Sequence, residues 1–484
     1  MEGQQRSSLK KNTIVSMIWN AVDKVGFQVV ALMVGIITAR LLSERDFGLI
    51  GALSVFTLIA NILVESGFSS ALIRRKENTD EEYSAVFVFN LGLSVLIYAI
   101  LFFSAPLLAS FYEMPELTDL ARLLFLAIVL NSLGIVQIAI YTRNLEFSKL
   151  TKINLAAGVV AGVVTVWLSV KGYGYWALAW QQILQVGVKT LLLWVCSSWR
   201  MTSCNFAVLK ELFSFSIFIM FTSFLSNFSR SVYNMVIGKV YQAERLGFYT
   251  QANKYQQILA NIITSTLSGV AYPVLSSLRE EPGRQLMYFR KIMRIASFLI
   301  CPTMLGMFVL AEEFVSIVLT DKWLPIVPYF KILLVAGVLA PFHTLNGQML
   351  LTNGYSNVYF KTEVVRSVFT LLSLLLITIS IEAMLYGYLG ASVISYLYDN
   401  YVIQKHCSYK ITHQHKDIFP YIAVSCFMLF AVEVMDYYAN VGNIYLQAVI
   451  KLIAGAALYL LPLKLLGSAV LKDMLELLRG KRSV

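Results

Sequence analysis

The first apolar stretch of the chain, roughly residues 13 to 41, carries a regular set of polar side chains. They are Ser16, Asn20, Asp23, Lys24 and Gln28. Steps of three or four residues place side chains on one face of an α-helix, so the pattern predicts a helix with one polar face. A charge facing lipid would cost about 2.5 to 3.5 kcal/mol on insertion scales, so we expect this face to contact protein or water.

Apolar runs of about 17 to 25 residues recur along the rest of the chain, long enough to cross a hydrocarbon core of about 30 Å as helices. The strict alternation of barrel strands is not seen. We predict an all-α polytopic membrane protein with about fourteen transmembrane helices, near residues 13–38, 47–70, 83–105, 120–140, 153–170, 177–197, 213–236, 250–272, 292–311, 330–351, 364–380, 388–404, 419–435 and 445–466.

The composition agrees with this prediction. Of 484 residues, 58% are hydrophobic and only 14% are charged, which leaves too little polar surface to coat a soluble particle of this size. If the N-terminus is cytoplasmic, most Lys and Arg residues fall in cytoplasmic segments, so the positive-inside rule predicts that both termini are cytoplasmic. The same bias explains the net charge of +11. We therefore expect no nucleic-acid partner.

Two segments of the chain resemble each other. Leu58-Ile-Ala-Asn-Ile-Leu63 reappears as Ile258-Leu-Ala-Asn-Ile-Ile263, and the polar positions of the predicted second helix recur on the eighth. The duplication predicts two six-helix lobes, which enter the membrane in the same orientation because six is even. They would be related by a pseudo-two-fold axis along the membrane normal. We expect an N-terminal lobe at 1–200, a cytoplasmic linker at 201–212, a C-terminal lobe at 213–410, and two further helices with a cytoplasmic tail at 411–484.

The duplicated polar faces predict the chemistry of a central cavity. Cations outnumber acids there, a balance that suits an anionic phosphate group surrounded by sugar hydroxyls. The alternative is that these groups pair with one another and hold helices together, as Lys24 and Glu65 could on neighbouring helices. The candidate substrate-binding residues are Lys24, Arg230, Lys254, Asn20, Asn61, Asn227, Asn261 and Gln257.

Two acids are candidates for energy coupling. Asp23 and Glu65 belong to the same predicted cavity, where a carboxylate could take up and release a proton as the lobes change orientation. A fixed ion pair with Lys24 is the alternative. A proton gradient, a sodium gradient or the membrane potential is the expected energy source, and we expect no cofactor and no metal.

Two runs carry a family resemblance. Ala39-Arg-Leu-Leu-Ser-Glu-Arg-Asp-Phe-Gly48 and Gly247-Phe-Tyr-Thr-Gln-Ala252 resemble the polysaccharide flippases of the O-antigen, colanic-acid and teichuronic-acid type, within the multidrug/oligosaccharidyl-lipid/polysaccharide exporter superfamily. The stretch that begins at Glu65 is similar to them as well. The resemblance implies functional charges at Lys24 and Glu65. Family members often carry an acid near Asn234, where this chain has an amide.

The resemblance also implies a function. It implies a bacterial inner-membrane flippase that moves undecaprenyl-pyrophosphate-linked oligosaccharide by alternating access, among membrane lipids and alongside a polysaccharide polymerase and glycosyltransferases. An ion-coupled multidrug exporter of the same superfamily is an alternative, although cationic drugs would favour an acidic cavity. A membrane-embedded glycan-modifying enzyme is a further alternative. It would be expected to show a metal-binding acidic motif or a large catalytic loop, and the sequence has neither. We therefore expect a transporter rather than an enzyme.

Overall fold

A computed structural model describes residues 19, 26–65, 72, 78–144, 146–439 and 442–478. The regular elements within these ranges are all helices. By compactness the chain divides into two units, residues 1–247 and 248–484, and each is described by itself. The division lies inside one helix, α10 (Ala243–Ser277).

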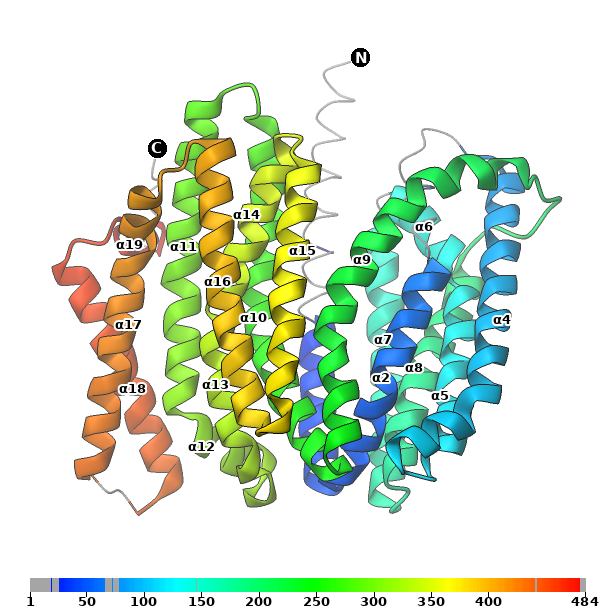
Figure 1. Ribbon diagram of the computed structural model, residues 1–484, viewed down its shortest axis with the longest axis horizontal. Helices are drawn as coiled ribbons and strands as arrows, with labels where there is room; N and C mark the ends of the chain where they lie inside the picture. The colour runs from blue at the N-terminus through cyan, green and yellow to red at the C-terminus, as the bar shows by residue number, and fades with distance from the viewer. Residues whose placement is uncertain are drawn as a thin grey trace. The chain divides into compact units, whose positions relative to one another are not determined.

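The first unit is a bundle of long helices (Figure 1). α7 packs along α8, α4 along α5, and α2 along α9. The helices described in this unit are Gly26–Leu41, α2 (Glu44–Glu65), α4 (Asp80–Tyr112), α5 (Leu117–Ser132), α6 (Ile135–Arg143), α7 (Phe147–Val170), α8 (Tyr175–Cys196) and α9 (Ala207–Val240).

Local sequence explains how several of these helices begin and pack. α4 starts with a capping box, in which the Thr79 side chain accepts from the Glu82 amide and the Glu82 side chain accepts from the Thr79 amide. Gly162 on α7 allows a close approach to the helix Gly26–Leu41, because a Cβ there would lie 2.4 Å from Val34 Cγ2. α5 and α6 together form one apolar stretch that bends by 41° where they meet.

The second unit is a second helical bundle, in which α11 packs along α17, α15 along α16, and α17 along α18. After α10 its elements are α11 (Pro282–Val309), α12 (Ala311–Phe314), the π-helix η1 (Val315–Leu319), the 3-10 helix η2 (Asp321–Ile326), α13 (Val327–Gly337), α14 (Ala340–Thr352), α15 (Ser356–Ser373), the 3-10 helix η3 (Leu374–Thr378), α16 (Ile381–Cys407), α17 (Ile411–Ala439), α18 (Ile444–Leu465) and α19 (Ala469–Leu478).

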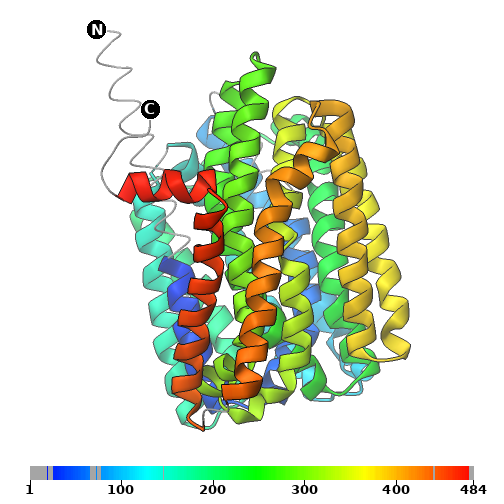
Figure 2. The ribbon, with the colours of Figure 1, turned by 90° about the vertical axis from the view of Figure 1, so that its left-hand side faces the viewer.

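A buried carboxylate joins α11 to α17. Asp417 Oδ2 lies 2.7 Å from Arg290 Nε, and its other oxygen lies 2.6 Å from Arg294 Nη2. The Tyr409 hydroxyl donates to Asp417 at 2.8 Å. Burial raises the pKa of the Tyr409 hydroxyl, so it keeps the proton that it donates. At the same end of this unit the short helix α19, red in Figure 2, turns sideways from the end of α18. Its Asp473 pairs with Lys291 on α11 at 2.7 Å.

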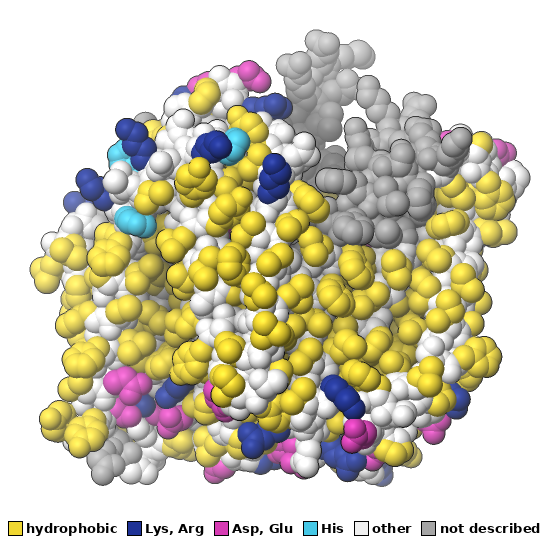
Figure 3. Space-filling view, in the orientation of Figure 1, with side chains coloured by type: hydrophobic (Ala, Val, Ile, Leu, Met, Phe, Trp, Pro, Cys, Tyr) yellow, Lys and Arg dark blue, Asp and Glu magenta, His cyan; other side chains and the backbone are white. Residues whose placement is uncertain are grey.

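The helices are long and apolar enough for a membrane. Within the described residues, eight helices could span one by length and composition, or nine if α5 and α6 form one span. Side chains such as Phe103 (78% exposed) and Phe430 (69% exposed) are apolar and lie open on the helix surfaces, as lipid-facing residues do. In the second unit, hydrophobic side chains cover the middle of the visible face, and charged side chains gather toward its ends (Figure 3). The chain is thus a multi-pass membrane protein, and the count of fourteen spans stays a prediction.

Thirteen of the fourteen predicted spans fall on observed helices. The predicted span 47–70 corresponds to α2, 330–351 to α13 with α14, and 364–380 to α15 with η3. The remaining span, 13–38, is described only at residue 19 and from residue 26 onward, as the helix Gly26–Leu41. The predicted lobe boundary at 201–212 rests on the internal repeat of the sequence, whereas the compact units, which divide after residue 247, rest on contacts in space. The two are not comparable, so the predicted domains stay a prediction.

Candidate functional site

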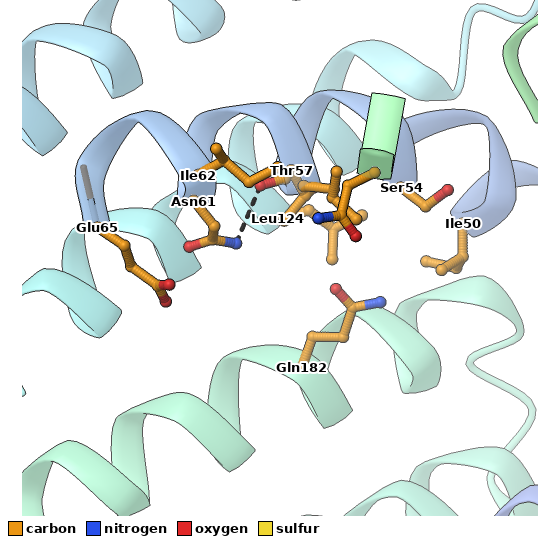
Figure 4. A pocket seen from close by; sticks show the side chains of 10 residues that line it. Ile50, Ser54, Thr57, Asn61, Ile62, Glu65, Leu124 and Gln182 are labelled. Carbon is orange, nitrogen blue, oxygen red and sulfur yellow. Dashed lines mark hydrogen bonds between the residues drawn. The ribbon is translucent and has the colours of Figure 1, made fainter. Parts of the chain in front are cut away.

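The polar face of α2 lines a cavity in the first unit. Ser54, Thr57, Asn61 and Glu65 follow one another at steps of three, four and four residues, so they share one side of the helix. The cavity measures about 340 Å³, within the range of about 300 to 1,000 Å³ typical of small-molecule sites. In Figure 4 the Gln182 side chain of α8 points across this space toward α2. Asn227 of α9 and four apolar residues, Ile50, Leu58, Ile62 and Leu124, complete its lining.

Amide side chains form a short hydrogen-bonded row along the cavity. Asn61 Nδ2 donates to the Thr57 carbonyl oxygen at 2.9 Å, one turn earlier on the same helix. Asn131 of α5 donates from Nδ2 to Asn61 Oδ1 at 3.3 Å and to Glu65 Oε1 at 3.5 Å. Lys189 of α8 acts electrostatically on Glu65. The two bonds that Asn131 donates are long and therefore weak.

The amide at position 234 has a structural partner in this unit. Asn234 Nδ2 of α9 donates to Ser54 Oγ of α2 at 2.9 Å, and Ser54 itself donates to the Gly51 carbonyl oxygen at 2.6 Å. Asn234 therefore links α2 to α9 beside the cavity.

The predicted cavity residues of the second unit lie along α10. Lys254 is half-buried, and its Nζ lies 5.8 Å from the centre of the Tyr255 ring. Among the described residues, no carboxylate lies within 4.0 Å of this ammonium group. Gln257 and Asn261 are exposed on the same helix, and Gln257 donates to Asn253 Oδ1 at 3.1 Å.

Several predicted site residues lie outside the described ranges. Asn20, Asp23 and Lys24 belong to them, and so does the side chain of Arg230. The backbone of Arg230 is in α9, three residues after Asn227, which lines the α2 cavity. The structure thus brings together Asn61, Asn227 and Glu65 around one cavity, and places Lys254, Gln257 and Asn261 on one helix of the other unit.

Sequence reasoning missed a second polar site. His343, Glu363, Arg366 and Asp399, here called the His343 cluster, come together in the second unit from α14, α15 and α16. The sequence did contain a signal, because three of the four fall inside predicted membrane spans, where ionisable residues are rarely placed without a function.

Comparisons with known proteins agree with this picture. Residues 37–328 match the model of a family described as polysaccharide biosynthesis protein. The succinoglycan biosynthesis transport protein ExoT of Rhizobium meliloti is 24% identical over 96% of this chain and 95% of its own length. The teichuronic acid biosynthesis protein TuaB of Bacillus subtilis (23% identical; 73% and 74% covered) and the lipopolysaccharide biosynthesis protein WzxC of Escherichia coli (24%; 74% and 74%) are also similar.

The fold of this chain resembles those of solved structures. The lipid II flippase MurJ, in an inward closed conformation, matches with a TM-score of 0.76 over 95% of this chain and 98% of that one, at 13% identity. An inward-facing multidrug resistance MATE family transporter matches with a TM-score of 0.60 over 81% and 95%, at 16% identity. Both are named as transporters, not as enzymes. Because the family model covers more than half of the sequence, the chain belongs to the polysaccharide biosynthesis protein family, and it has the fold shared by MurJ and MATE transporters.

Proposed function

We propose that this protein is a flippase that moves a polyprenyl-pyrophosphate-linked oligosaccharide from the cytoplasmic to the outer leaflet of a bacterial inner membrane. The observation that carries the proposal is the α2 cavity, whose polar lining consists of hydroxyl and amide groups with one carboxylate. Such groups both donate and accept hydrogen bonds, as sugar hydroxyls require. The names of ExoT, WzxC and MurJ support the same class of cargo.

The anionic part of the cargo needs cations. Lys254 on α10 has no carboxylate partner among the described residues, and Arg230 lies one turn beyond Asn227 in the sequence of α9. We assign the pyrophosphate to Lys24, Arg230 and Lys254. Each charge-assisted contact would contribute about 1.5 to 3 kcal/mol.

The transport cycle follows from the repeated architecture. In this proposal the two lobes rock about a shared site by alternating access, both termini are cytoplasmic, and Asp23 or Glu65 takes part in coupling to an ion gradient. A polysaccharide polymerase and glycosyltransferases are the partners expected to consume and supply the cargo.

Deleting the gene tests the proposed function. We expect surface polysaccharide to be lost while lipid-linked oligosaccharide accumulates and stays inaccessible to a glycan-specific probe added outside spheroplasts. Normal polysaccharide together with increased sensitivity to cationic drugs would replace the flippase with the multidrug exporter. Loss of the lipid-linked oligosaccharide itself would instead indicate an enzyme of its synthesis.

Point variants test the site. Lys254→Ala, and the double change of Lys24 and Arg230 to alanine, should each slow export about tenfold or more, since 1.4 kcal/mol corresponds to a factor of ten. The same change at the exposed Lys410 is the matched control, and the membrane level of each variant is measured first. Wild-type export by the stable double variant would return those two charges to a structural role.

A further inference from the structure

The His343 cluster is a compact set of ionisable groups within the apolar helices of the second unit. His343 Nδ1 on α14 lies 2.7 Å from Asp399 Oδ2 on α16. Arg366 on α15 connects the two acids, with Nη1 at 3.0 Å from Glu363 Oε1 and Nη2 at 3.5 Å from Asp399 Oδ2. Three neighbouring helices, seen together in Figure 1, therefore meet at one hydrogen-bonded group.

This cluster lacks one positive charge. Asp399 is 3% exposed, Glu363 5% and His343 9%, so water screens them little. With a neutral imidazole, two carboxylates face one guanidinium, which gives a net charge of −1. Asp399 Oδ1 has no hydrogen-bond partner among the described residues. One proton on His343 would make the cluster neutral.

The other described groups around the cluster do not supply the missing charge. The Tyr396 ring of α16 has its centre 6.4 Å from that of His343, and a phenol does not become a cation. Lys331 of α13 is paired elsewhere, 3.0 Å from Glu312. Arg366, whose side chain keeps 18% of its surface exposed, connects the cluster to the outside.

Two turn residues, Val338 and Leu339, separate α13 from α14 shortly before His343. The apolar stretch Asp321–Thr352 is interrupted between α13 and α14, and the His343 amide donates to the Leu339 carbonyl oxygen in the first turn after the break. On the other side of the break, Gly337 abuts α10, because a Cβ there would lie 2.2 Å from Gln256 Nε2. Interrupted helices beside ion sites occur in transporters whose lobes move. The break thus touches both the cluster and the helix that carries Lys254.

We propose that the His343 cluster binds one proton in each transport cycle and, through the break between α13 and α14, couples that proton to the position of α10. Asp399 holds the Nδ1–H tautomer of His343, so Nε2 takes up and releases the proton. A metal cation fits less well, because the Arg366 guanidinium already lies 3.5 Å from the same carboxylate oxygen and would repel it. The coupling role rests on the proposed flippase function, whereas the proton site itself does not.

Proton binding can be measured without the cargo. The full-length protein, labelled with ¹⁵N-histidine and reconstituted in lipid bilayers, contains four histidines, and their ring nitrogens report protonation. We expect one signal, absent in His343→Gln and present in His415→Gln, to change from the neutral to the cationic form between about pH 5 and 9. His415 is the control because it is exposed on α17.

Asp399→Asn tests the pairing. Because removal of the adjacent anion destabilises the imidazolium, the midpoint of the His343 signal should move to lower pH by about one unit, a tenfold loss of proton affinity. A ring that stays neutral throughout this range, or an unchanged midpoint in Asp399→Asn, would overturn the proton site. So would a signal that responds to replacement of sodium by choline but not to pH.

The coupling is tested in cells that depend on this protein for surface polysaccharide. Export in His343→Gln should respond less to an imposed pH gradient than in the wild type, whereas His415→Gln should respond as the wild type does. A His343→Gln protein that reaches the membrane and keeps the wild-type dependence on the gradient would overturn the coupling. If the flippase function itself fails, the histidine titration is unaffected, so the two failures are distinguishable.

Discussion

Replacing Lys451 should weaken the attachment of α18 to the second unit. Lys451 Nζ lies 2.5 Å from Glu313 Oε1 of α12 and 2.8 Å from Asp436 Oδ2 of α17, and the lysine and glutamate side chains are only 6% and 4% exposed. Among the described residues, Glu313 Oε2 has no hydrogen-bond partner, so Lys451→Met leaves that carboxylate without one. Asp436 keeps a hydrogen bond from Gln447 at 2.6 Å, so most of the loss falls on Glu313.

The expected destabilisation of Lys451→Met is about 3 to 5 kcal/mol, the usual cost of removing one partner of a buried pair. This destabilisation has an upper limit, because a glutamate that has lost its partner can take up a proton rather than stay charged. From an ordinary glutamate pKa of about 4.3, protonation at pH 7 costs about 4 kcal/mol, and at pH 5 about 1 kcal/mol. The stability deficit of Lys451→Met relative to the wild type should therefore shrink as the pH falls from 7 to 5.

Thermal unfolding of the purified protein in detergent is the assay, with Lys464→Met as the control because Lys464 is exposed on the same helix. Adding Glu313→Gln to Lys451→Met should restore part of the stability, since a neutral amide replaces the stranded carboxylate, with a coupling of about 0.5 to 3 kcal/mol. If Lys451→Met unfolds at the same temperature as Lys464→Met, or if the double variant is less stable than the single one, the reasoning is wrong.

Three further changes test the packing of the helices. Gly48→Ala would place a Cβ 1.8 Å from a backbone carbonyl oxygen at the start of α10, so we expect it to lower the stability of the protein by about 1 to 3 kcal/mol. Gly92→Ala, whose Cβ would have nothing within 4 Å, is the control and should be neutral or stabilising. The melting temperatures of the two variants test this. Asp417→Asn weakens the bonds to two arginines and should lower the stability by about 1.5 to 3 kcal/mol. Asp473→Asn should lower it less, because Asp473 and its partner Lys291 are half-exposed. Equal melting temperatures of the two variants would contradict this. Thr79→Ala removes the α4 cap and should cost about 1 kcal/mol, visible as faster amide exchange in the first turn; unchanged exchange would argue against the cap.

The sequence predicted where the membrane helices lie better than where they end. Apolar runs are read directly, but the turns at each end depend on partners that hydropathy does not report. α4 begins three residues before the predicted span 83–105 because Thr79 caps it, and α9 extends through polar residues on both sides of 213–236. The break between α13 and α14 lies inside the predicted span 330–351 because both halves are apolar, although Pro341 marks it in the sequence, since a proline has no N–H to donate to the Gly337 carbonyl oxygen four residues earlier.

The candidate site was likewise predictable from the sequence only in part. The polar face of α2 repeats at helical spacing within one segment, so Asn61 and Glu65 could be assigned to one cavity from the sequence, and the structure places both there. The pairing of His343 with Asp399 spans 56 residues and three helices, and no local pattern contains it. Arg366 falls at the start of the predicted span 364–380, but the sequence alone does not show that its guanidinium bonds two carboxylates inside the bundle. A single ionisable residue in an apolar span is therefore ambiguous until its partners are known. Here the partners leave the group with a net charge of −1 when the imidazole is neutral, and the proposed proton site rests on that sum.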